Sequence, residues 1–254
     1  MISKNKIKYI RSLELKKNRT REGVFVAEGH KLVGDILPFF DCVYIAATSK
    51  WLDANADALS QLRHTEIDEV TDEELHRASF QETPQQVLAI FRQPSTEIDI
   101  RDIASSNLCL ALDDVQNPGN LGTIVRLADW FGIEHIFCSR GCADVYSPKT
   151  IQATMGGIAH VQVHYVDLPS ALSSLPEGTP IYGTFLDGEN IYSKTLQQQG
   201  VIVMGNEGKG VSVEVASLAT HRLYIPNYPE GRETAESLNV AIATAIICSE
   251  FRRR

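Results

Sequence analysis

Short apolar runs of the kind that form buried parallel strands recur through the second half of the chain. They lie at 108–115, 135–139, 159–166, 181–186, 201–205 and 221–226. Segments with helical spacing of apolar residues separate several of these runs, notably 123–131, 149–156 and 238–251. Because strands that alternate with helices form a parallel sheet covered on both faces, the pattern predicts an α/β domain over 108–254.

The first part of the chain has shorter elements. A basic helix is expected over 3–18, followed by a strand at 23–27, a helix at 30–37, a strand at 43–46, a helix at 71–78 and a strand at 86–91. The helix at 71–78 begins with a capping box. We therefore expect a small α/β domain over 1–94, and the polar stretch 95–107 reads as a linker.

The composition mainly excludes classes of protein and kinds of site. Of the 254 residues, 43% are hydrophobic and 22% are charged, which is ordinary for a globular protein. No stretch approaches the roughly 18 consecutive apolar residues of a membrane helix, and no apolar segment of a secretory signal follows the N-terminus. The five cysteines have neither a disulfide framework nor the spacing of a zinc site. We expect a cytoplasmic protein with no metal site and no membrane contact.

The distribution of charge changes this picture. A net charge of −8 argues against a nucleic-acid partner, but the first 21 residues hold a single acid, Glu14. Their basic residues are Lys4, Lys6, Lys8, Arg11, Lys16, Lys17, Arg19 and Arg21. A local basic cluster can hold phosphate in an acidic protein, because the contact is short-ranged and screened. A solvated helix face remains an equal alternative from the charges alone.

Three loops at the ends of apolar strands concentrate glycine, asparagine, serine and charge. They are DVQNPGNLG at 114–122, GNEGKGVS at 205–212 and IPNYPEGRETAESLN at 225–239. Ligands of parallel sheets bind beyond the C-terminal ends of the strands, so these loops are the expected site. The second loop matches neither a Walker A sequence nor the dinucleotide fingerprint, which argues against a nucleotide-binding loop of either kind.

The helices that follow the first and third loops carry the candidate polar residues. Asn120 is expected to cap the first helix, and Arg126 lies off its apolar stripe, where it faces the loop or pairs with Asp129. Ser237 is expected to cap the second helix, and Asn239 lies in its first turn. The apolar arc of this second helix predicts deep burial of Leu238, Ala241, Ile242, Ala245 and Ile246.

Together the three loops resemble the motifs of the SpoU (TrmH-type) RNA methyltransferases, a family of the SPOUT class. The matching stretches, in order, are NPGNLGTIVR, GNEGKGVS, and IP followed by ESLNVAIATAI. The intervening DVYSPKTIQATMGGIAHVQV resembles the family's middle segment, and the similarity covers 108–251. The basic helix and FVAEGHKLV resemble the small substrate-binding domain of many members, which is similar to a ribosomal-protein RNA-binding fold. Members with this domain usually modify ribosomal RNA, so ribosomal RNA is favoured over transfer RNA.

The resemblance implies a fold and a cofactor. The C-terminal parallel sheet would contain a deep trefoil knot, one of the rare exceptions to unknotted folding, and the protein would be a homodimer. Knot loops in the family hold S-adenosylmethionine in a bent shape, largely through backbone groups. Carried over by motif, the contacts would be Gly205, Ile225 and Leu238, with Thr184 added at the end of its strand.

The resemblance also implies the reaction and its residues. The activity would be transfer of the methyl group of S-adenosylmethionine to a ribose 2′-hydroxyl, with Asn120, Arg126, Glu207, Ser237 and Asn239 as the site. The family gives its motif-one arginine, here Arg126, the central role in activating the hydroxyl. A guanidinium keeps its proton at neutral pH, so we expect Arg126 to bind the adjacent phosphate and stabilise negative charge on the 2′-oxygen.

Two departures from the family pattern and three alternatives accompany this interpretation. The third loop is longer than the usual glycine turn, and Gln152 stands where many relatives place an arginine. The alternatives are a transfer-RNA 2′-O-methyltransferase, an RNA-binding relative without catalysis, and an enzyme that methylates a small molecule. Intact motifs disfavour the second alternative, and the basic N-terminal part disfavours the third.

Overall fold

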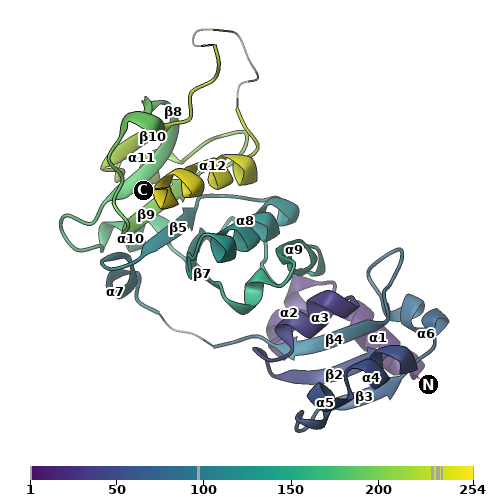
Figure 1. The fold of residues 1–254 in the computed structure, drawn as a ribbon. Coiled ribbons are helices and arrows are strands. Elements are labelled where there is room, and N and C mark those ends of the chain that lie inside the picture. The colour runs from purple at the N-terminus through teal and green to yellow at the C-terminus, as the bar shows by residue number, and fades with distance from the viewer. Residues whose placement is uncertain (1, 96–97, 230–231, 233–234, 236, 254) are drawn as a thin grey trace. The chain divides into compact units, whose positions relative to one another are not determined.

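The computed structural model describes residues 2–95, 98–229, 232, 235 and 237–253. Residues 96–97 of the expected linker and 230–231, 233–234 and 236 of the long third loop lie outside the described residues. The chain forms two compact units, Met1–Thr96 with Asp144–Ala159, and Glu97–Ala143 with His160–Arg254 (Figure 1). The domain boundaries expected from the sequence, 1–94, 95–107 and 108–254, stay a proposal.

The first unit contains a four-stranded sheet in the order β1-β4-β2-β3. Strand β4 is antiparallel to both β1 and β2, and β2 is parallel to β3. The strands are β1 (Val24–Glu28), β2 (Cys42–Ala47), β3 (Glu66–Glu69) and β4 (Val87–Arg92). The helices are α1 (Lys4–Ser12), α2 (Lys16–Glu22), α3 (His30–Ile36), α4 (Ser49–Ala54), α5 (Ala56–Ser60), α6 (Asp72–Ala78) and α9 (Pro148–Thr154), which is followed by the 3₁₀ turn η1 (Gly157–Ala159).

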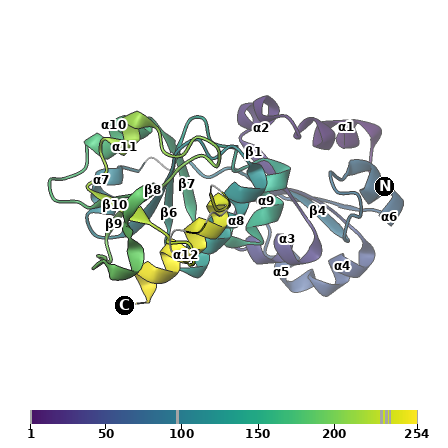
Figure 2. The same ribbon diagram turned by 90° about the horizontal axis from the view of Figure 1, so that it is seen from above.

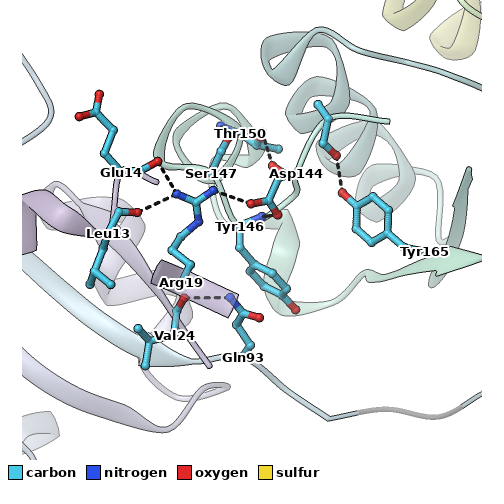
Figure 3. A network of polar contacts seen from close by, with 11 residues as sticks. Leu13, Glu14, Arg19, Val24, Gln93, Asp144, Tyr146, Ser147, Thr150 and Tyr165 are labelled. Atoms are coloured by element: carbon cyan, nitrogen blue, oxygen red, sulfur yellow. Dashed lines mark hydrogen bonds and ion pairs between the residues drawn. The ribbon is translucent and has the colours of Figure 1, made fainter. Parts of the chain in front are cut away.

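Most of the elements expected in this unit are confirmed, including the capping box between Thr71 and Glu74 at the start of α6. The single basic helix over 3–18 is wrong, because two helices, α1 and α2, occupy this region. Their junction is held by Arg19, which donates to the carbonyls of Leu13 (2.7 Å) and Glu14 (2.6 Å) (Figure 3). These carbonyls follow the end of α1, so the guanidinium satisfies acceptors that a continuous helix would have satisfied internally.

Arg19 also forms a buried ion pair. Its guanidinium lies 2.5 Å from the carboxylate of Asp144, and its side chain is only 2% exposed. Asp144 in turn accepts from the backbone amide of Tyr146, whose ring packs 5.2 Å from that of Phe25. The segment Asp144–Ala159 is thereby fastened to the sheet of the first unit by both polar and aromatic contacts.

The basic N-terminal cluster is therefore partly structural. Arg11 donates to the carbonyl of Ser79 and lies over the ring of Phe80, and Lys6 pairs with Glu66 at 2.5 Å. Together with Arg19, these side chains stabilise the unit through contacts with other protein groups. Among the other basic residues of this region, Arg21 pairs with the adjacent Glu22. The reading of the region as a phosphate-binding surface rests on Lys4, Lys8 and Lys17.

Breaking the buried pair is expected to destabilise the protein strongly. We expect Arg19→Met to lower the free energy of unfolding by about 3–5 kcal/mol, because it leaves the Asp144 carboxylate with an uncompensated charge. The control is Arg21→Met, which removes an exposed pair with Glu22 and is expected to cost less than about 1 kcal/mol. Urea denaturation followed by circular dichroism compares the two variants. Equal midpoints would contradict a stabilising role for the buried pair.

The second unit contains six strands, all parallel, in the order β10-β8-β9-β5-β6-β7. They are β5 (Leu108–Leu112), β6 (His135–Ser139), β7 (Gln162–Val166), β8 (Ile181–Asn190), β9 (Gly200–Met204) and β10 (His221–Tyr224). The helices are α7 (Ile100–Ala104), α8 (Pro118–Trp130), α10 (Leu168–Ser173), α11 (Val213–Ala216) and α12 (Val240–Arg252), with the 3₁₀ turn η2 (Ile191–Ser193). The expected parallel sheet is confirmed, whereas the deep knot stays a prediction.

Helices cover both faces of this sheet. On one face, α7, α10 and α11 pack over Cys109, Ala111, Phe137, Val201 and Val203 in a single apolar cluster. On the other face, α8 and α12 lie side by side (Figure 2). Of the five residues expected to be deeply buried here, only Ala241 is buried. Leu238 and Ile242 are exposed, and Ala245 and Ile246 are partly buried, because α12 rests on its neighbours along a narrower arc. No helix among the described residues is long and apolar enough to span a bilayer.

Two stacked histidines join neighbouring strands of this sheet. His135 Nδ1 lies 3.3 Å from His164 Nε2, and the ring of His164 also stacks on that of Phe137. Burial, together with the charge of His135, lowers the pKa of His164 to about 4, and burial also lowers the pKa of His135. The folded protein therefore holds His164 neutral at pH values where an unfolded chain, with a histidine pKa of about 6.5, is protonated.

This difference predicts a loss of stability in acid. As the pH falls from about 6.5 towards 4, the unfolded state binds a proton at His164 that the folded state does not bind. The free energy of unfolding should therefore fall by about 2–3 kcal/mol. We expect His164→Phe to reduce the dependence of the free energy of unfolding on pH. The control His64→Gln, at an exposed position, should retain it. Urea midpoints measured across this pH range test the prediction. An unchanged slope in His164→Phe would contradict it.

Candidate functional site

A cavity of about 480 Å³ opens at the C-terminal ends of β8, β9 and β10. All four expected cofactor contacts, Thr184, Gly205, Ile225 and Leu238, line it, together with Glu207 and Ser237 of the expected catalytic set. The volume falls in the range of about 300–1,000 Å³ that is usual for small-molecule sites. The structure therefore brings the ends of the second and third motifs together around one space.

Gly205 is the tightest point of this cavity wall. A Cβ atom added at Gly205 would lie 2.3 Å from the carbonyl carbon of Gly210 and 2.4 Å from the amide nitrogen of Val211. The loop folds back on itself through paired backbone bonds between Asn206 and Gly210, at 2.9 and 2.8 Å. Only glycine fits here, because the facing atoms are backbone and have no freedom to move aside.

Asn206 fastens the second motif to the first, a role that the sequence interpretation missed. Its Nδ2 donates to the carbonyl of Asp114 at 2.8 Å, and its Oδ1 accepts from the backbone amides of Gly208 and Lys209. The buried carboxylate of Asp113 accepts from the amide of Ser212 at 2.8 Å. An asparagine between glycines in a strand-end loop was a usable signal, because such residues commonly hold turns.

Thr184 lies where β8 separates from β9, since their pairing ends at Gly183 and Val203. Its hydroxyl donates to the carbonyl of Val203 at 3.0 Å and so satisfies an acceptor at the end of the paired ladder. Ile225 directly follows β10, and Leu238 precedes α12 with a half-exposed side chain. These positions present backbone groups and apolar surface to the cavity, an arrangement suited to a small organic ligand.

A chain of side-chain hydrogen bonds connects the three motifs beside the cavity. Asn239 Nδ2 donates to Asn120 Oδ1 at 3.1 Å, and Asn120 Nδ2 donates to Glu207 Oε1 at 2.5 Å. Each residue comes from a different motif, with 119 and 87 residues of separation along the chain. The relay fixes the orientation of the Glu207 carboxylate, because one of its oxygens is already engaged.

Both helix caps differ from those expected from the sequence. Asn117, and not Asn120, caps α8 by accepting from the amides of Gly119 and Asn120. Asn239, and not Ser237, caps α12 by accepting from the amides of Ala241 and Ile242. Asn120 is thus free to bond Glu207, and Asn239 uses its oxygen for the cap and its nitrogen for the relay. Asn239 is exposed, so burial does not force these hydrogen bonds.

The other two residues of the expected catalytic set, Arg126 and Ser237, lie differently with respect to the cavity. Arg126 lies exposed on α8, six residues after Asn120 and outside the cavity lining. Among the described residues no hydrogen bond or ion pair involves its guanidinium, and Asp129 bonds His160 at 3.0 Å, so the surface pair with Arg126 is not formed. Ser237 lines the cavity but makes no cap. Arg126 is therefore an exposed cation outside the cavity lining, and its part in the site stays a prediction.

The chemistry of the site is that of a binding cavity with an amide–carboxylate relay. Within the described part of the chain, no group of three or more His, Cys, Asp or Glu side chains could hold a metal ion. At the cavity rim Arg222 lies 3.6 Å above the ring of Phe185 and pairs with Asp187 at 2.6 Å. This stack gives one edge of the cavity both an aromatic face and charged groups, with cation and ring attracted electrostatically.

Comparisons with known proteins agree with this geometry. Residues 107–249 match the model of the SpoU rRNA Methylase family, and residues 4–89 match the MRM3-like substrate binding domain. The chain is 32% identical to the 23S rRNA (guanosine(2553)-2′-O)-methyltransferase RlmP of Bacillus subtilis, over 97% of this chain and 96% of the relative.

Solved structures with the same fold extend the match. An RNA methyltransferase of the TrmH family from Porphyromonas gingivalis has a TM-score of 0.89 and 44% identity, covering 100% of this chain and 99% of its own. An AdoMet-bound rRNA methyltransferase from Sinorhizobium meliloti has a TM-score of 0.86 and 31% identity, covering 100% and 97%. With its second and third motifs around one cavity and the first joined to them by hydrogen bonds of Asn120, the chain belongs to the SpoU rRNA methylase family.

Proposed function

We propose that this protein transfers the methyl group of S-adenosylmethionine to a ribose 2′-hydroxyl of large-subunit ribosomal RNA. The observation that carries the proposal is the relay Asn239–Asn120–Glu207, which joins the polar residues of all three motifs beside the cavity. The Bacillus subtilis relative is named for this reaction on 23S rRNA, which supports both the 2′-O chemistry and the substrate.

The cavity fits S-adenosylmethionine on structural grounds. Gly205, Gly210 and Val211 line it with closely packed backbone, where a Cβ at Gly205 would collide with the other two residues, and the cavity volume suits a nucleoside-sized ligand. Thr184, Gly205, Ile225 and Leu238 would hold the cofactor, largely through backbone groups. When bound, the cofactor supplies a methyl group already activated on a sulfonium, so the protein has only to position it and assist proton removal.

The residues of the chain then have distinct parts in the reaction. In the transfer, a bond between the ribose 2′-oxygen and the methyl carbon would replace the carbon–sulfur bond of the sulfonium, and the hydroxyl proton would pass to water. Arg126 binds the neighbouring phosphate and stabilises negative charge on the 2′-oxygen, as an oriented cation does. Glu207 is held in place by Asn120 and Asn239 and orients the ribose, with Ser237 as a further polar contact at the cavity.

The remaining proposals concern organisation. Residues 1–94 would bind the RNA substrate and 108–254 would form a knotted methyltransferase domain, joined by 95–107, in a cytoplasmic homodimer. Exposed apolar side chains on the two adjacent helices of the second unit support self-association: Trp130 on α8 is 84% exposed, and Ile242 on α12 is half-exposed. A second copy that packs against these two helices would cover both side chains.

The test is tritiated methyl transfer to ribosomal and transfer RNA from a strain that lacks the gene, followed by mapping of 2′-O-methylribose. Label at one ribose of large-subunit RNA is expected. Label in transfer RNA alone would keep the chemistry and overturn the substrate. Cofactor binding without label in any fraction would instead support an RNA-binding relative that does not catalyse methyl transfer.

A further inference from the structure

The long loop between β10 and α12 exposes one aromatic ring next to the cofactor cavity. Tyr228 is 90% exposed and lies three residues after Ile225, which lines the cavity. Three residues of extended chain span at most about 11 Å, so the ring lies within reach of whatever enters the active site. The same loop returns to the cavity at Ser237 and Leu238.

The described part of this loop is held in shape by its own hydrogen bonds. Tyr224 donates its hydroxyl to Asn227 Oδ1 at 3.3 Å, and Asn227 Nδ2 donates to the carbonyl of Arg232 at 3.0 Å. The amide of Arg232 donates to the carbonyl of Pro229 at 3.2 Å. Asn227 thus bonds both Tyr224 at the base of the loop and Arg232, and the adjacent Tyr228 has its ring in solvent.

A single exposed tyrosine is ordinary on a protein surface. Here the ring belongs to the same loop as the exposed residue Arg232, whose carbonyl is bonded by Asn227, and the ends of this loop line the cavity. Proteins hold unstacked RNA bases on aromatic rings and the adjoining phosphates with cations. A protein partner would favour a broader apolar patch than one exposed ring in a loop that also carries an exposed arginine.

We propose that Tyr228 stacks against an unpaired RNA base beside the methylated ribose, with Arg232 on the adjoining phosphate. This inference rests on the proposed function, since it assumes an RNA substrate at the cavity. Stacking is tolerant of base identity, so Tyr228 selects for an unpaired nucleotide and not for a particular base. It would admit only RNA whose target region is open or can be opened, which makes the loop a determinant of substrate shape.

The test uses large-subunit ribosomal RNA from a strain lacking the gene, with filter binding for affinity and tritiated methyl transfer for KM and kcat. Tyr228→Ala is expected to weaken RNA binding between about 5- and 150-fold, the range for loss of one base–aromatic stack. Tyr228→Phe keeps the ring and should stay within about twofold of the wild type. The affinity for S-adenosylmethionine should not change in either variant.

Matched controls separate stacking from other roles. Tyr192→Ala removes another exposed tyrosine of the same unit, outside the cavity lining, and should bind RNA as the wild type does. Arg232→Ala should weaken binding and reduce the slope of log affinity against log salt by about 1, as expected for one lost phosphate contact.

Three results would overturn the inference: wild-type RNA affinity in Tyr228→Ala, an equal loss in Tyr228→Phe, or a loss of cofactor affinity. The proposed function fails separately if the wild type binds the RNA without transferring methyl groups, and the binding comparison then still decides the role of Tyr228. A wild type that does not bind the RNA would overturn both.

Discussion

Arg126→Ala is expected to reduce methyl transfer by at least about 100- to 1,000-fold, the cost of removing one oriented charge-stabilising group, while the affinity for S-adenosylmethionine stays unchanged. The two effects separate because Arg126 is exposed on α8 and lies outside the cavity lining. Its loss therefore leaves the cofactor walls intact and removes only the cation that would meet phosphate and the developing negative charge. Single-turnover methyl transfer and calorimetric titration with the cofactor measure the two quantities.

Two further variants sharpen this experiment. Arg126→Lys retains the charge but loses the forked geometry of the guanidinium, so it should recover only part of the rate. Arg101→Ala removes an exposed arginine of the same unit, paired with Asp99 on α7, and should leave the rate unchanged. Near-normal methylation by Arg126→Ala, or a parallel loss of cofactor affinity, would remove Arg126 from its proposed role.

Gly205→Val is expected to lower the affinity for S-adenosylmethionine, because the new side chain would collide with backbone atoms of its own loop. The added Cβ would lie 2.3 Å from the carbonyl carbon of Gly210, so the loop from 205 to 211 has to open. Overpacking of this kind costs about 1–3 kcal/mol, which corresponds to roughly a 5- to 150-fold loss of affinity if the displacement falls on the cavity wall.

The same loop offers a matched control. In Gly208→Ala the nearest atom to the new Cβ is Asn206 Oδ1 at 3.7 Å, which is ordinary contact. This variant should bind the cofactor like the wild type. Calorimetry gives the affinities, and thermal unfolding shows whether Gly205→Val has remained folded. A folded Gly205→Val protein with wild-type affinity would show that the cofactor does not rest on this wall.

Local sequence pattern determined the elements of this protein well. Each of the six apolar runs became a strand of one parallel sheet, because a run of apolar residues between polar loops is stable only when both faces are covered. The capping box at Thr71 and Glu74 was readable because its two hydrogen bonds span three residues. The three motif loops were likewise visible as polar interruptions after strands, and they identified the family.

Assignments that depended on distant partners were decided only by the tertiary structure. Asn117 and Asn120 have similar local propensity to cap α8, and the difference between them is Glu207, 87 residues away, which engages Asn120. Likewise, Arg19 looked like one surface cation among eight until Asp144, 125 residues away, provided its buried partner. The sequence by itself determined which segments become strands, helices and site loops, because those choices rest on neighbouring residues. Only the folded chain decided which polar side chain bonds which, because hydrogen bonds and ion pairs depend on distances that no local pattern contains.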